Sequence, residues 1–141
     1  MSRGRSFSSA LNAFLLTGMS AHAACLNGHP SVREEQQNSK AVVLARVVGQ
    51  REVPETSDGF YFDGTIYRIK IERAFQGNIG ADAELFSENS SGRFPMAVGS
   101  KYLLFINERH DRLLVDYCGN SGLLSRRGKE RREVERLAAR Y

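Results

Sequence analysis

The first 23 residues have the composition of an export signal, and this restricts which part of the chain folds and in what surroundings. Arg3 and Arg5 give a basic start, and a mostly apolar and small-residue stretch follows over residues 7–19. Ala21-His22-Ala23 places small residues at the two positions that a signal peptidase reads. The apolar stretch is too short to span a membrane as a helix, which needs roughly 20 apolar residues. We therefore predict a signal peptide at residues 1–23 and an exported protein, either periplasmic or secreted.

The predicted mature chain, residues 24–141, has the size of a single domain. Cleavage of the signal peptide would lower the formal charge from +4 to about +2, because two arginines and no acid are lost with it. Much of the remaining basic character lies after Arg126, where Glu130, Glu133 and Glu135 interrupt it. Such mixed charge is typical of a solvated helix face, so we expect no nucleic-acid partner.

The mature chain contains two cysteines, Cys25 and Cys118. In an oxidising compartment an even pair is most simply one disulfide, which here would tie the mature N-terminus to a point near the end of the chain. The alternative is an envelope lipoprotein anchored through Cys25, and membrane contact is expected only in that case. His22 stands three positions before Cys25, where a lipoprotein signal has a large aliphatic residue, so the disulfide is the preferred reading.

Local patterns predict a short helix and then a strand after the first cysteine. Ser31-Val32-Arg33-Glu34 has the spacing of a capping box, so we expect a helix at residues 31–39. Residues 41–48 are rich in β-branched side chains and end at Gly49, which indicates a central strand. Asp63-Gly64 is a strong turn pair, and it predicts a hairpin between residues 60–62 and the segment that begins at Thr65.

The rest of the chain predicts further short strands and a final helix. Thr65, Tyr67, Ile69 and Ile71 alternate with polar residues, as in a half-buried antiparallel strand. Three more strands are expected at residues 81–87, 101–106 and 113–117, with a polar loop at residues 107–112. A helix is expected from Arg127 onward, with an apolar stripe that would pack on the sheet. The stripe consists of Val134, Leu137, Ala138 and Tyr141. About five antiparallel strands with a helix at each end favour a mainly β fold, a small closed barrel.

Several of these landmarks occur in an order typical of one family. The N-terminal cysteine and polar helix are followed by the strand at residues 42–47 and the turn Ala74-Phe75-Gln76-Gly77. Gly99 then precedes an apolar strand, and Cys118 follows late. The chain therefore resembles netrin-like modules, which include the tissue inhibitors of metalloproteinases and exported bacterial relatives. The resemblance implies an OB-type barrel over residues 24–141 and a binding role rather than catalysis.

Two departures argue against the inhibitory mechanism of that family. The inhibitors begin with Cys-x-Cys and offer the free amine of the first cysteine to the protease zinc. Here Asn27 takes the place of the second cysteine, and the predicted cleavage leaves Ala24 ahead of Cys25. We therefore expect a protein-binding or protease-inhibitor-like domain without this zinc-directed N-terminus.

No residue pattern in the chain predicts catalysis or metal binding. The two histidines after the signal, His29 and His110, lie in no known catalytic signature and are read as surface residues. A disulfide between Cys25 and Cys118 would remove the thiolates that a structural zinc site requires. We predict no catalytic residue, no metal and no cofactor, and we leave the binding residues unassigned. The expected function is that of an exported, monomeric, non-enzymatic module for a protein or another envelope component, and a small hydrolase is a further alternative.

Overall fold

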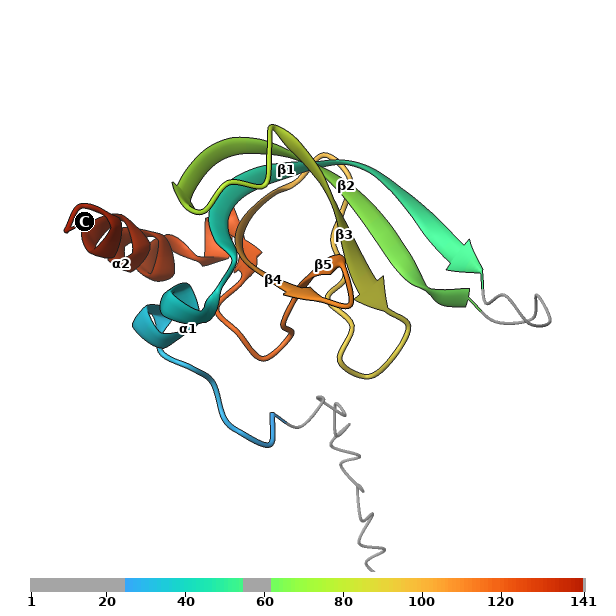
Figure 1. The fold of residues 1–141 in the computed structure, drawn as a ribbon, viewed down its shortest axis with the longest axis horizontal. Helices are drawn as coiled ribbons and strands as arrows, with labels where there is room; N and C mark the ends of the chain where they lie inside the picture. The colour runs from blue at the N-terminus through green and yellow to red at the C-terminus, as the bar shows by residue number, and fades with distance from the viewer. Residues whose placement is uncertain (1–24, 55–61, 141) are drawn as a thin grey trace, which may run out of the picture.

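The computed structural model describes residues 25–54 and 62–140. Residues 1–24, which include the predicted signal peptide, residues 55–61 and Tyr141 lie outside the described residues. The structure has a helix at each end of a β-rich body (Figure 1). The elements are α1 (Val32–Asn38), β1 (Ala41–Pro54), β2 (Phe62–Gln76), β3 (Asp82–Glu88), β4 (Lys101–Arg109), β5 (Arg112–Val115), β6 (Gly122–Leu123), the 3₁₀ helix η1 (Leu124–Arg126) and α2 (Gly128–Ala138).

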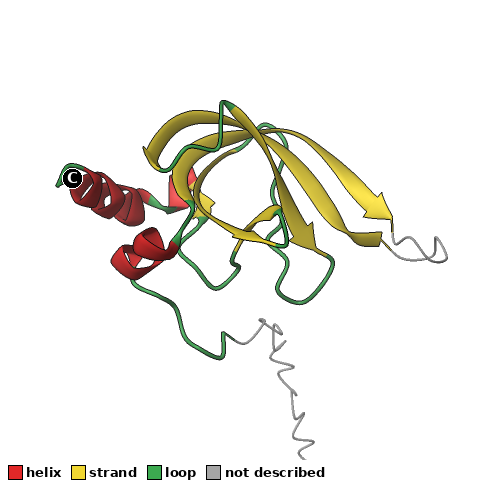
Figure 2. Cartoon of the chain, viewed as in Figure 1, coloured by secondary structure: helices red, strands yellow, loops and turns green. Residues whose placement is uncertain are grey.

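The predicted mainly β fold class is confirmed, with a short helix at each end. The strands follow the order β1-β2-β3-β5-β4-β6, and β1 also pairs with β4, which closes the first five into a ring (Figure 2). The ring is not a regular antiparallel barrel, because β3 and β5 run parallel and pair only at Leu85 and Leu113. The strands therefore form a mixed sheet that closes in an irregular ring. The short β6 adds a sixth strand beside β4.

Apolar side chains on the two faces of the ring build two separate cores. The interior contains Val43, Ala45, Tyr67, Ile69 and Leu85, together with further residues of β4 and β5. The predicted alternation of β2 is therefore confirmed. On the outer face of β1 and β4 a second cluster packs beneath the helices. Both faces of these two strands are buried, which explains why their sequences are continuous apolar runs.

The two helices form where the local sequence predicts them. Ser31 caps α1 and completes the capping box with Glu34. In α2, Val134 and Leu137 are buried, and Val134 packs against the outer face of the sheet as the predicted stripe requires. Arg131 forms an ion pair with Glu135 along the exposed side of this helix. The helix therefore covers the second core and is a packed part of the domain.

The predicted turn at Asp63-Gly64 is wrong, because both residues belong to β2. Gly64 pairs with Val53 of β1 and with Glu88 of β3. A Cβ on Gly64 would lie 2.8 Å from the Phe86 ring and closer still to a backbone carbonyl. The absence of a side chain at Gly64 therefore allows β2 and β3 to approach closely. The connection from β1 to β2 falls outside the described residues.

The predicted polar loop at residues 107–112 is also corrected. β4 continues to Arg109, and β5 begins at Arg112. The connection is a two-residue turn in which His110 has φ 51° and Asp111 has φ 60°. Positive φ at both central residues is the geometry that joins twisted antiparallel strands, so this segment is a tight hairpin.

Candidate functional site

The predicted disulfide between Cys25 and Cys118 is present, with Cα atoms 5.7 Å apart. It ties the segment before α1 to the loop after β5. The bond fits a protein of an oxidising, extracytoplasmic compartment. In the part of the chain that the structure describes, the helices lack the length and apolarity that a membrane crossing requires.

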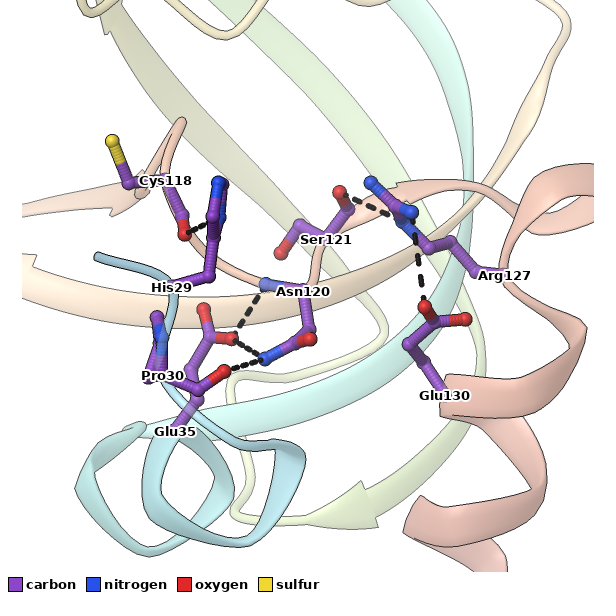
Figure 3. A network of polar contacts seen from close by, with 8 residues as sticks. All are labelled: His29, Pro30, Glu35, Cys118, Asn120, Ser121, Arg127 and Glu130. Carbon is purple, nitrogen blue, oxygen red and sulfur yellow. Dashed lines mark hydrogen bonds and ion pairs between the residues drawn. The ribbon is translucent and has the colours of Figure 1, made fainter. Parts of the chain in front are cut away.

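A second set of contacts, drawn in Figure 3, holds the same two segments together. The backbone N–H and the side-chain amide of Asn120 donate to one oxygen of Glu35, at 2.6 Å and 2.7 Å. The same amide group also donates to the carbonyl of Pro30 at 3.0 Å. These bonds fix the loop after Cys118 against the start of α1.

Glu35 is an unusual residue in this network because its carboxylate is buried. Its side chain is only 7% exposed, and its second oxygen has no hydrogen-bond partner among the described residues. Burial raises the pKa of the Glu35 carboxyl, while the bonds from Asn120 act in the opposite direction. Gly119 lies directly against this carboxylate and leaves no room for a Cβ. Glu35 was not predicted from the sequence, because a capped polar helix gives no signal that one of its acids is buried.

A groove opens beside this network. Its volume is about 830 Å³, within the range of small-molecule and peptide sites. It is lined by Cys25 and His29, by residues 94–95, by Tyr102 and Tyr117, and by residues 119–123 and 126–127. Three regions that are distant in the sequence, residues 25–29, 94–102 and 117–127, therefore meet at one surface. A smaller hollow of about 220 Å³ is lined by residues of β3, β4 and β5 and of the adjoining loops.

The ionisable side chains of the groove are basic or phenolic. Arg126, Arg127 and His29 contribute the basic groups, and no Asp or Glu is found among the described lining residues. Arg127 donates to the carbonyl of Ser121 at 3.3 Å and lies 3.8 Å from Glu130 (Figure 3). Gly122 permits this arrangement, because a Cβ there would lie 2.6 Å from the Arg127 Nε.

Aromatic residues form the apolar part of the groove. The rings of Phe94 and Tyr102 meet edge to face, with centroids 6.3 Å apart. The Tyr102 hydroxyl accepts a bond from the backbone N–H of Ala97, which fixes the ring further. Tyr117 is 38% exposed at the same surface. The groove therefore combines a rigid aromatic pair, an exposed ring and two arginines.

The two histidines lie in different parts of the molecule. His29 is exposed, and its Nδ1 lies 2.7 Å from the backbone carbonyl of Cys118, with which it shares a hydrogen bond. Among the described residues no hydrogen bond or ion pair joins either histidine to a carboxylate. His110 lies in the β4–β5 turn, away from the groove lining. His29 thus helps to position the loop that carries Cys118.

Comparison with models of known protein families gives no match for this chain, and comparison with curated proteins gives none either. The netrin-like resemblance therefore stays a prediction that rests on the short motifs in the sequence.

Proposed function

We propose that the chain is an exported, non-enzymatic binding module whose binding face is the groove beside the Cys25–Cys118 disulfide. The observation that carries this proposal is the composition of the groove, which contains exposed arginine and tyrosine on a rigid support. Tyrosine and arginine are enriched at the energetic centres of protein interfaces, and lysine and acidic residues are depleted there. A protein of the cell envelope is accordingly the preferred class of partner.

The support around the groove favours binding without large rearrangement. The disulfide and the bonds between Glu35 and Asn120 both restrain the loop that forms one wall. A restrained surface loses less conformational entropy when it binds, so more of the contact energy contributes to affinity. Since the Cys25 sulfur cannot carry a lipid while it is bonded to Cys118, we propose a soluble module rather than one anchored through that residue.

The proposal is tested by site-specific photo-crosslinking in the source organism. A photo-reactive phenylalanine derivative replaces Tyr117 in the groove, and in a control protein it replaces Lys70, which is exposed on β2. We expect discrete crosslinked species from position 117 and none of the same mass from position 70. Equal patterns at both positions, or no adduct at position 117, would contradict the proposed binding face.

A further inference from the structure

We propose that the groove binds an extended acidic segment of a protein partner, one that also carries an aromatic side chain. This inference rests on the proposed function, and it adds the chemistry of the ligand. Three features support it: the sign of the charge, the aromatic floor and the size of the groove.

The charge of the groove is complementary to an acidic ligand. Arg126 is exposed and has no hydrogen bond or ion pair with any residue that the structure describes. Its neighbour Arg127 has Glu130 as its acidic partner at 3.8 Å, a distance too long for a strong hydrogen bond. The N-terminus of α2 follows at Gly128 without a side-chain cap, and its free N–H groups add to the positive potential. A carboxylate would therefore replace water beside two guanidinium groups without meeting a negative charge from the lining.

The floor of the groove is suited to an aromatic side chain beside that carboxylate. Phe94 is half-buried, and its edge-to-face contact with Tyr102 holds the ring in place. Tyr117 is exposed on the same surface and can contact a ligand ring by stacking. An acidic residue next to an aromatic residue in an extended peptide would occupy both parts of the groove together.

The size of the groove favours a short peptide over an anionic polysaccharide or a nucleic acid. The basic groups of the lining are two arginines and one histidine, and arginine binds a carboxylate through two parallel hydrogen bonds. The volume of about 830 Å³ also has the size of a local site rather than that of a long track for a polymer. We expect a few consecutive residues of the partner to fill it.

The test uses an array of synthetic hexapeptides in which acidic and aromatic residues occupy all combinations of positions. Each peptide is paired with its amide version, in which every Glu becomes Gln and every Asp becomes Asn. Affinities of the oxidised protein for the best pairs are then measured by fluorescence polarisation. Acidic, aromatic peptides should bind, and their amide versions should bind at least about tenfold more weakly, since one charge-assisted hydrogen bond has about this effect.

Variants of the protein locate the site. Arg126→Ala should weaken binding of the acidic peptide by about tenfold. Arg132→Ala is the matched control, because Arg132 is an exposed arginine of α2 outside the groove, and it should leave the affinity within about twofold of the wild type. Tyr117→Ala should weaken the binding of a peptide that contains an aromatic residue more than the binding of the same peptide with serine in that position. Circular dichroism and a thiol assay confirm that each variant keeps its fold and its disulfide.

Several results would overturn the inference. Equal affinities for the acidic peptides and their amide versions would overturn it. Equal losses of affinity in Arg126→Ala and Arg132→Ala would also overturn it. The absence of any peptide binding would also overturn it, as would binding of hyaluronate, an anionic polysaccharide, in place of the peptides. Crosslinking at position 117 distinguishes this failure from that of the proposed function. If discrete adducts form at position 117 but no acidic peptide binds, the proposed binding face stands and the acidic partner is excluded.

Discussion

Replacement of Gly119 by alanine should destabilise the whole domain through the buried carboxylate of Glu35. A Cβ at position 119 would lie 2.7 Å from the Glu35 Cδ and 3.0 Å from Oε2, and closer still to Oε1. Real Cβ atoms essentially never approach a heavy atom within 3.0 Å. The carboxylate would have to move by roughly 1 Å or more to restore ordinary van der Waals contact.

That movement removes the two hydrogen bonds that Glu35 accepts from Asn120, at 2.6 Å and 2.7 Å. A hydrogen bond to a charged group contributes about 1.5–3 kcal/mol, and part of this is recovered when the carboxylate and Asn120 meet water. We expect Gly119→Ala to lower the free energy of unfolding by about 2–4 kcal/mol. Urea denaturation of the oxidised protein measures this change.

Two further variants show whether the contact with Glu35 is the cause. Gly92→Ala is the matched control, because the nearest atom to a Cβ there is 3.9 Å away, and it should be close to neutral. In a double-mutant cycle, Gly119→Ala should cost less than about 1 kcal/mol when Glu35 has already been replaced by alanine. If the full cost persists in the Glu35→Ala background, the steric argument is wrong.

Three other perturbations test separate parts of the structure. Burial raises the folded-state pKa of Glu35 above its unfolded value, so protonation of this carboxyl stabilises the fold at acidic pH. This contribution should be lost as the pH rises through the folded-state pKa. Denaturation curves measured over a pH series should show this trend in the wild type and lack it in Glu35→Gln. Cys118→Ser should lower the free energy of unfolding by about 2–5 kcal/mol, since the disulfide closes a loop over 93 positions. An unchanged melting temperature would mean that the bond does not stabilise the domain. Leu137→Asp places a charge at a buried position of α2 and should lower the melting temperature strongly, whereas Arg132→Ala should leave it unchanged. A Leu137→Asp protein that melts like the wild type would show that α2 is not a packed element.

Local patterns in the sequence were sufficient for most elements of the fold. The capping box at Ser31 predicts the start of α1, and the alternation from Thr65 to Ile71 predicts the buried face of β2. These predictions succeed because hydrogen bonds at a helix end and the two-residue period of a strand depend on neighbours in the chain. The disulfide was predictable for a different reason, since two cysteines in a chain that is predicted to be exported allow only one pairing within the chain.

The error at Asp63-Gly64 shows where local patterns fail. The dipeptide has strong turn chemistry, but Gly64 is required for the close approach of β2 to β3. That approach depends on which strands become neighbours, a property of the whole sheet. The same limit applies to β3 and β5, whose parallel contact follows from the closure of the ring and has no signal in either strand.

Only the tertiary structure decided the candidate site. Glu35 lies on a short polar helix, and its burial follows from the loop that Cys118 brings against it. Arg126 and Tyr117 lie nine positions apart, and no pattern in the segment between them predicted a binding site. Their convergence with Phe94 requires the disulfide, the ring and η1 to be in place together. Strand and helix periods depend on adjacent residues, whereas a groove depends on the distances between segments that only the folded chain brings together.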